Sequence, residues 1–380
     1  MRLHYTNLLD SAVNITGSTS VLSIDSCVLS YGVDISDELS GGLAILLDLY
    51  NIHVSIRNVV STRNVAKRGA NFLFGIRDNI GSIKIINSTS SLANHLPPHV
   101  RDEALYGAGF ALVHRLSDTP IQMPTTAKTL LYISDSKFYD NNGVGFHFQQ
   151  MAFEGNDNVK YDVIICNSSF QNHVNPSGSG VITVFNLRRL IIFNSTFAIN
   201  KQTALQAFDS TLYFEGQIIF SGNNGTLGGA LMLQGGSKFY LMPNTHVQIV
   251  SNHAKRGGGI YVEDENARAI PYVCFFQVFD LHYPYFDSMI TLENNTADEA
   301  GSAVYGGDID NCATNEYGVN SSTLFTAVFK ISDTPSNVSQ ISSNPFAVHV
   351  CNHWSDTGSE TYIVQVYPGQ TLKGASGCSV

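Results

Sequence analysis

The chain has 380 residues and 41.4 kDa, which is enough to bury a large core and, by length alone, to form two or three domains. Charged residues make up 14% of the chain, against about 25% in an average globular protein, while apolar residues make up 43%. This composition excludes disorder driven by high charge and low hydrophobicity. The net charge of −10 argues against nucleic acid as a partner, because neutralising phosphates requires a basic face.

Asn and Gly are the most informative residues in the composition, with 32 copies of each, whereas Pro has 11. Both residues tolerate the positive φ angles of tight turns. Together with frequent Ser and Thr, they favour many short strands joined by turns and disfavour long helices. We therefore expect an all-β protein.

The start of the chain, Met1–Asp10, contains no apolar stretch of the kind that a signal peptide needs. No apolar run approaches 18 residues, so we expect no membrane-spanning helix. Eight N-x-S/T sequons and an even number of Cys residues favour secretion. We therefore expect an extracellular or cell-surface location, as part of a longer secreted or anchored protein. The alternative is a cytosolic protein with free thiols.

A first repeated motif, Ile-x-[Asp/Asn]-Ser-x-Phe, runs through the first half of the chain. Its clear copies are Ile133–Phe138, Ile165–Phe170 and Ile192–Phe197, and degenerate copies occur at Asp25–Val28 and Ile85–Ser88. The alternation places Ile and Phe on one face of a strand, with a polar turn-forming pair between them.

A second motif combines an apolar residue, two spacers and Asn with a following Gly-Gly-small-aliphatic stretch. Its copies pair Phe220–Asn223 with Gly228–Leu231, Ile249–Asn252 with Gly257–Tyr261, and Leu292–Asn295 with Gly301–Tyr305. A turn Asn can hydrogen-bond the backbone of a neighbouring coil, and Gly allows a tight corner where a β-carbon would clash. Both motifs therefore predict corners of a repeating coil.

The apolar anchors of these motifs lie 32, 27, 23, 29 and 43 residues apart, and they are Phe138, Phe170, Phe197, Phe220, Ile249 and Leu292. Such intervals fit one coil of a parallel β-helix with three short strands and three turns. They are too short for a βαβ unit in each interval. A β-sandwich would also contain short strands, but it would not repeat one motif at this spacing.

The motif Phe220-Ser-Gly-Asn223 with Gly228-Gly-Ala-Leu231 resembles the FxxN and GGA[ILV] repeats of polymorphic outer membrane proteins. The block from Gly257 to Cys312 is closer in style to large surface proteins of some marine invertebrates. The resemblance covers about residues 15–330 and implies a right-handed parallel β-helix displayed on a cell surface. It rests on the repetition of short, degenerate motifs.

We therefore expect parallel β-helix repeats over residues 1–330, with insertions near 101–126 and 263–287. A small β-rich C-terminal extension is expected over 331–380, where Pro and Ser become frequent, and we expect it to be a truncated part of a longer module. The segment Ile363–Gly369 reads as a strand that ends in a turn.

The sequence contains no recognisable catalytic or metal site. Parallel β-helix hydrolases need clustered Asp carboxylates with a His and a basic residue, and lyases of this fold need grouped acidic ligands. The nearest acidic groups, Asp34–Glu38, Glu263–Glu265 and Asp308–Asp310, lie beside turns where solvated acids are ordinary. His349 and His353 flank Cys351 without completing a tetrahedral site. We expect no catalytic residue, no metal and no cofactor.

The turn Asn-x-Ala-Lys-Arg-Gly occurs twice, at Asn64–Gly69 and Asn252–Gly257. A pair of basic turns could bind an acidic glycan or partner. The simpler interpretation is that these are equivalent solvated turns of two coils.

Among the Cys residues, we expect a disulfide between Cys274 and Cys312, which follow Tyr261 and Tyr305 by 13 and 7 residues in adjacent coils. Cys351 with Cys378 is a weaker second pair. Cys27 and Cys166 lie within motif strands and are expected to be buried free thiols.

Two sequons, at Asn224 and Asn320, lie in polar turns and are the expected glycosylation sites. Asn167 and Asn194 belong to the first motif and are expected to be too enclosed for modification.

The leading functional hypothesis is a non-enzymatic extracellular solenoid that acts in adhesion, as a spacer or as a ligand-binding scaffold. Its partner would be a glycan or protein at one face of the solenoid. The alternative is a carbohydrate-active enzyme, either a polysaccharide lyase or a glycoside hydrolase of the parallel β-helix class.

Overall fold

A computed structural model describes residues 13–16, 21–33, 42–47, 53–66, 70–77, 82–95, 109–115, 129–143, 145–151, 162–174, 180–263, 274–278, 287–306, 327–332, 348–354 and 360–365. The chain divides into two compact units, residues 1–196 and 197–380, and each is described by itself.

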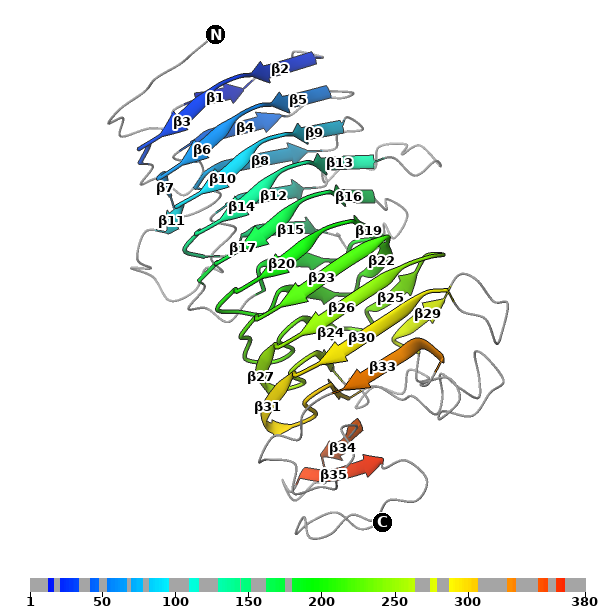
Figure 1. The fold of residues 1–380 in the computed structure, drawn as a ribbon. Coiled ribbons are helices and arrows are strands. Elements are labelled where there is room, and N and C mark those ends of the chain that lie inside the picture. The colour runs from blue at the N-terminus through cyan, green and yellow to red at the C-terminus, as the bar shows by residue number, and fades with distance from the viewer. Residues whose placement is uncertain are drawn as a thin grey trace. The chain divides into compact units, whose positions relative to one another are not determined.

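The first unit is built from coils that each contribute one strand to three parallel sheets (Figure 1). Sheet A contains, in spatial order, β1 (Val13–Thr16), β4 (Leu43–Leu47), β8 (Phe72–Arg77), β12 (Phe110–Arg115), β15 (Phe146–Met151) and β18 (Ile182–Phe185). Sheet B contains β2 (Val21–Asp25), β5 (His53–Arg57), β9 (Ser82–Ile86), β13 (Thr129–Ser134), β16 (Asp162–Cys166) and β19 (Arg189–Phe193). Sheet C contains β3 (Val28–Ser30), β6 (Val60–Thr62), β10 (Thr89–Ser91), β14 (Lys137–Tyr139) and β17 (Ser169–Gln171), and a two-stranded sheet joins β7 (Val65–Ala66) to β11 (Asn94–His95).

The second unit repeats the arrangement, beginning in β20 (Thr196–Ala198). Its A strands are β21 (Leu205–Phe208), β24 (Leu231–Gln234), β28 (Ile260–Val262) and β32 (Val304–Tyr305). Its B strands are β22 (Thr211–Glu215), β25 (Lys238–Leu241) and β29 (Phe276–Val278). Its C strands are β23 (Gln217–Ser221), β26 (His246–Val250), β30 (Met289–Glu293) and β33 (Phe329–Ser332), with β27 (His253–Arg256) and β31 (Thr296–Ala300) forming a small side sheet. Each unit is therefore a parallel β-helix, as the repeat spacing predicts.

The predicted anchors occupy equivalent inward positions of sheet C. In the first unit Phe138 is the register partner of Phe170, and the two rings stack with centroids 4.8 Å apart. In the second unit Phe220 pairs with Ile249, which pairs with Leu292. The six anchors are at most 1% exposed, so the repeat alignment is confirmed.

Sheets A and B complete each core with further rows of apolar side chains. In the first unit Phe110 stacks on Phe146 with ring centroids 4.8 Å apart, and Ile165 pairs with Ile192 across sheet B. A β-helix coil is narrow, so an inward side chain meets its equivalents in the coils on either side. This repetition explains why the sequence has many short apolar segments and no long one.

The Gly-Gly-Ala corners leave no room for side chains. Gly228 has φ +64°, and a β-carbon there would lie 2.0 Å from the carbonyl oxygen of Leu231. A β-carbon on Gly229 would lie 2.2 Å from the carbonyl oxygen of Gly258. Gly is required here both by backbone conformation and by the close approach of the next coil.

Both predicted insertions contain strands of the regular sheets, which corrects their extent. Strand β12 pairs with β8 and β15, and β29 pairs with β25. The motif search missed these coils because it followed the sheet C anchors, and neither segment contains one. The remaining parts of 101–126 and 263–287 lie largely outside the described residues.

Near the C-terminus, β34 (Val348–Trp354) and β35 (Glu360–Gln365) form an antiparallel pair, and β34 also meets β32 at His349. The predicted extension therefore contains strands, one of them overlapping the Ile363–Gly369 segment. The repeat strands continue to Ser332. Across the described ranges, no helix has the length and apolar character that crossing a membrane requires.

Candidate functional site

The corner between sheets B and C is held by a ladder of serines in the first unit. The Oγ of Ser136 donates to the carbonyl of Ser134 at 2.7 Å and accepts the amide N–H of Ser88 at 3.2 Å. Ser168 and Ser195 repeat this pattern in the next coils. Cys27 takes the serine position in the first coil, with its Sγ 3.3 Å from the carbonyl oxygen of Asp25. The Ser of the first motif is thus a structural residue that satisfies buried backbone groups.

The corner between sheets C and A is held by a ladder of buried asparagines. In the second unit, the Oδ1 of Asn252 accepts the amide N–H of Asn223 at 3.0 Å, and its Nδ2 donates to the carbonyl of Phe220 at 3.0 Å. Asn223 and Asn295 bond in the same way to their neighbouring coils. Asn64 and Asn141 hold equivalent places in the first unit. The recurring Asn of the second motif therefore joins coils, as expected from its chemistry.

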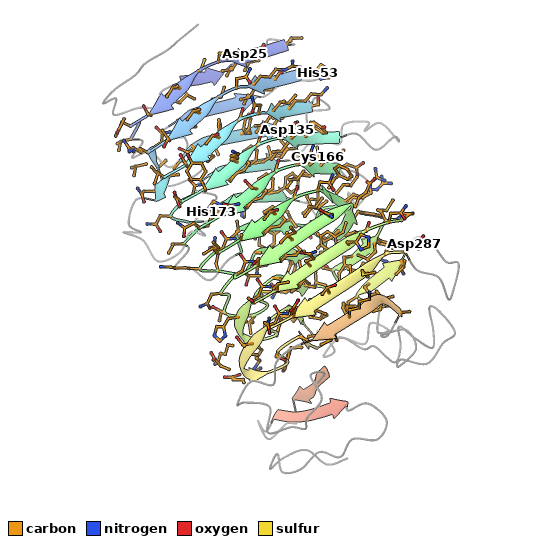
Figure 2. All side chains as sticks on the ribbon, in the orientation of Figure 1. Asp25, His53, Asp135, Cys166, His173 and Asp287 are labelled. Carbon is orange, nitrogen blue, oxygen red and sulfur yellow. The ribbon has the colours of Figure 1, made fainter. Side chains whose placement is uncertain are left out.

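His173 replaces asparagine in this ladder. Its side chain is fully buried, and its Nε2 lies 3.2 Å from the carbonyl oxygen of Phe138. Burial lowers the pKa of His173 from 6.5 to about 4. Figure 2 labels His173 at this corner. Sequence reasoning missed this replacement, because neither motif includes His173.

The two cations of the second basic turn pair with one carboxylate of the next coil. Lys255 Nζ lies 2.9 Å from a carboxylate oxygen of Glu299, and Arg256 Nε lies 2.6 Å from the other. Hydrogen bonds from Lys255, and then from Arg256, lower the pKa of Glu299. Lys67 and Arg68 of the first copy lie outside the described residues. The described turn thus supports the interpretation as an ordinary corner, with its cations engaged between coils.

An ion pair that sequence reasoning missed joins the first residues of two sheet B strands. Asp162 is 3% exposed and receives hydrogen bonds from the Nε and the Nη2 of Arg189. The two residues are 27 positions apart, so no local spacing could have linked them. The register of β16 with β19 makes them neighbours.

The candidate acidic groups are mostly outside the described residues: Asp34–Glu38, Asp264, Glu265 and Asp308–Asp310. Glu263 is described and accepts a hydrogen bond from Gln234 at 2.9 Å. In the described segments, no three His, Cys, Asp or Glu side chains come together as a metal site would need. The side chains of His349, Cys351 and His353 lie outside the description, although their backbone belongs to β34.

The cysteine predictions are resolved in part. Cys27 and Cys166 are buried thiols outside any disulfide, which confirms that prediction. Burial raises the pKa of Cys166, whose thiol lies 3.2 Å from the Tyr132 hydroxyl. Cys274 is buried beside β29, but Cys312 and Cys378 lie outside the described residues. Both disulfide pairs therefore stay predictions.

The expectation that Asn167 and Asn194 are enclosed is wrong. Both side chains are exposed, because each residue occupies the left-handed corner position, with φ of 47° and 43°. The motif buries the following Ser instead. Asn224 is exposed as expected, and Asn320 lies outside the described residues. Since Asn suits the corner and Ser fills the ladder, part of the sequon excess follows from the fold alone.

Exposed apolar side chains gather at one corner of the first unit. We call Tyr31, Leu92, Tyr139 and Val174 the corner ridge, and they are 43%, 38%, 37% and 39% exposed. The amide N–H of Leu92 donates a hydrogen bond to the carbonyl of Tyr139 in the next coil. Val174 forms a parallel β-bridge with Asn142, which belongs to the coil of Tyr139. Leu92, Tyr139 and Val174 therefore lie on three successive coils. The guanidinium of Arg63 lies over the Tyr31 ring, 5.4 Å from its centroid.

The corner ridge is not predictable from the motifs. Tyr31 and Leu92 occupy left-handed corner positions, with φ of 62° and 51°, a conformation that Asp140 and Asn172 adopt at the corresponding corners of later coils. Neither Tyr31 nor Leu92 is a residue type that suits a left-handed corner, so the motifs do not mark these positions.

No protein-family model, curated protein or solved structure matches the chain.

Proposed function

We propose that the protein is a non-enzymatic extracellular scaffold whose corner ridge binds an extended polysaccharide. The observation that carries the proposal is the group of exposed aromatic and aliphatic side chains on the coils of β3, β10, β14 and β17, 37–43% exposed. Isolated exposed apolar residues are ordinary, but a row of them favours an interaction site. Val28 and Val60, register partners on the outer face of sheet C, are each 38% exposed and widen the apolar surface.

The backbone conformation at the ridge adds a second argument. A left-handed conformation costs about 1–2 kcal/mol for a residue other than Gly, Asn or Asp. Tyr31 and Leu92 bear this cost while leaving two-fifths of each side chain in water. Local strain without compensating burial is more typical of binding surfaces than of structural corners.

The repeat geometry favours a long ligand. Parallel strands lie about 4.8 Å apart, so ridge side chains on neighbouring coils lie close together along the repeat direction. A polymer lying along the coils would meet several of them at once. Tyr139 offers an aromatic surface to the apolar face of a sugar ring, and the Arg63 guanidinium, which lies over the Tyr31 ring, offers hydrogen-bond donors at the same corner.

The proposed extracellular location rests on the sequons, on the proposed Cys274–Cys312 disulfide and on the resemblance to surface-displayed repeat proteins. Exposed Asn167, Asn194 and Asn224 are compatible with glycan attachment. The roles of the FxxN and GGA stretches as corner residues support the resemblance without testing it.

The test compares retention of purified protein on a panel of immobilised neutral and acidic polysaccharides. The ridge variant combines Tyr31→Asn with Leu92→Asn, and Asn suits the left-handed corner, so the fold should be kept or slightly stabilised. The matched control is Ser251→Asn, an exposed corner residue with φ 54° in the second unit. We expect at least about tenfold weaker retention of the ridge variant, and unchanged retention of the control.

Two outcomes would count against the proposal. One is wild-type protein that no polysaccharide retains. The other is a folded ridge variant, with an unchanged urea midpoint, that is retained as well as wild type.

A further inference from the structure

We infer that His173 makes the joint between the β14 coil and the β17 coil sensitive to acid, so that protonation of its ring opens this corner. The inference concerns an element of the ladder and stands independently of the proposed function. His173 is a titratable residue at a position that Asn occupies in other coils.

The ring is built into the corner. His173 is 0% exposed, and a β-carbon on Gly145 would lie 2.9 Å from its Cε1, so the imidazole fills the space above that glycine. Since the carbonyl oxygen of Phe138 can only accept, the Nε2 of His173 carries the hydrogen of their 3.2 Å contact. The neutral ring thus reproduces the bond that Asn Nδ2 makes to the equivalent carbonyl in other coils.

A second proton would place a charge in this enclosed position. Asp140, at the corner of the preceding coil, is the charged residue that acts on the ring among those the structure describes, and its attraction is smaller than the cost of burial. The other described neighbours, Phe138, Asn141 and Gly145, are uncharged. The ring therefore stays neutral in the closed corner and gains a proton when the corner opens.

The pKa of His173 in the closed and open corner sets the direction of the pH dependence. The pKa of His173 is about 4 in the closed corner and about 6.5 when the ring is in water. Between these values the open state binds more protons, so stability is complete above pH 6.5 and falls as the pH falls toward 4. The opening equilibrium should increase about 20-fold between pH 7 and pH 5.

The corner lies next to the corner ridge, because Val174 follows His173 directly and Tyr139 belongs to the preceding coil. If the ridge binds a ligand, the same opening would weaken binding in acid. This consequence rests on the proposed function, whereas the acid-sensitive joint does not.

The experiment is hydrogen exchange of the full chain, without ligand, at pH 7, 6 and 5, corrected for intrinsic exchange rates. Peptides covering 137–146 and 169–174 should lose about 20-fold in protection by pH 5, while β23 and β26 stay unchanged. His173→Asn should remove the loss by restoring the ladder residue. The control His246→Asn, at an exposed histidine of β26, should behave like wild type.

Equal corrected protection at pH 7 and pH 5 would overturn the inference, as would an equal loss in His173→Asn. A titration of the His173 ring by NMR in wild-type protein provides a test that needs no variant. An apparent pKa below 5 is expected, and a value near 6.5 would refute the acid-sensitive joint.

Discussion

Removing one asparagine of the ladder should cost more stability than removing a larger number of surface contacts. Asn252 is fully buried and its side chain makes four hydrogen bonds: its Oδ1 accepts from the backbone N–H and the Nδ2 of Asn223, and its Nδ2 donates to Phe220 and Asn295. Asn252→Ala leaves the buried N–H of Asn223 without its acceptor. It also removes the hydrogen bond that the carbonyl of Phe220 accepts from Asn252 Nδ2.

The magnitude follows from these two backbone groups. The other two partners keep a bond each, because Asn223 Nδ2 also donates to Phe197 and Asn295 Oδ1 also accepts from the amide of Asn252. A buried polar group left unsatisfied costs about 1–3 kcal/mol, and the N–H of Asn223 is such a group, whereas the Phe220 carbonyl belongs to a strand paired on both sides, so Asn252→Ala should lower the free energy of unfolding by about 1–3 kcal/mol. The matched control is Asn224→Ala, an exposed asparagine in the same turn, with an expected cost below about 0.5 kcal/mol.

Urea unfolding followed by far-UV circular dichroism measures the difference. Since repeat proteins can open locally, hydrogen exchange over β23, β26 and β30 should accompany it. A loss below about 1 kcal/mol for Asn252→Ala, or equal losses for the two variants, would refute the reasoning that the ladder satisfies the corner.

Three further predictions test other parts of the structure. Phe197 is fully buried with its ring 4.9 Å from that of Phe220, so Phe197→Ala should cost about 3–5 kcal/mol in urea unfolding, and a cost under about 1 kcal/mol would contradict its core position. Gln202 is 3% exposed, and its side-chain Oε1 and Nε2 lack a hydrogen-bond partner among the described residues. Gln202→Met should therefore raise the free energy of unfolding by about 1–2 kcal/mol, and a lower urea midpoint would argue against this. In protein from a secretory host, peptide mapping should find sugar at Asn224 and at either Asn167 or Asn194. Asn167 and Asn194 should not both carry sugar in one molecule, because their coils are about 4.8 Å apart. Sugar on both would show that the corner is more open than described.

The repeat motifs predicted the fold because each motif residue has a local physical role. Phe138 and Phe170 mark inward positions, Asn252 marks a corner, and Gly228 marks a backbone conformation that other residues resist. The segments that contain β12 and β29 lack these markers, so the motifs predict insertions there. Their strands follow from pairing with β8 and β25, which is a long-range property.

The candidate site was harder to predict than the fold. Tyr31 and Leu92 of the corner ridge have left-handed backbone conformations that their residue types disfavour. Motifs built from favourable corner residues therefore do not predict these positions. The placement of Asn167 was wrong because the motif was assigned inward as a whole, whereas the left-handed turn directs Asn outward and the next Ser inward. His173 could be recognised only once the register placed it in line with Asn141.

On the proposed function, the protein binds polysaccharide without cleaving it. This is tested by incubating wild-type protein with each polysaccharide that retains it, and then quantifying new reducing ends and unsaturated uronate products. We expect retention that depends on Tyr31 and Leu92, with product no higher than for heat-denatured protein. Accumulation of either product by intact protein would refute a non-enzymatic scaffold and establish a hydrolase or lyase instead.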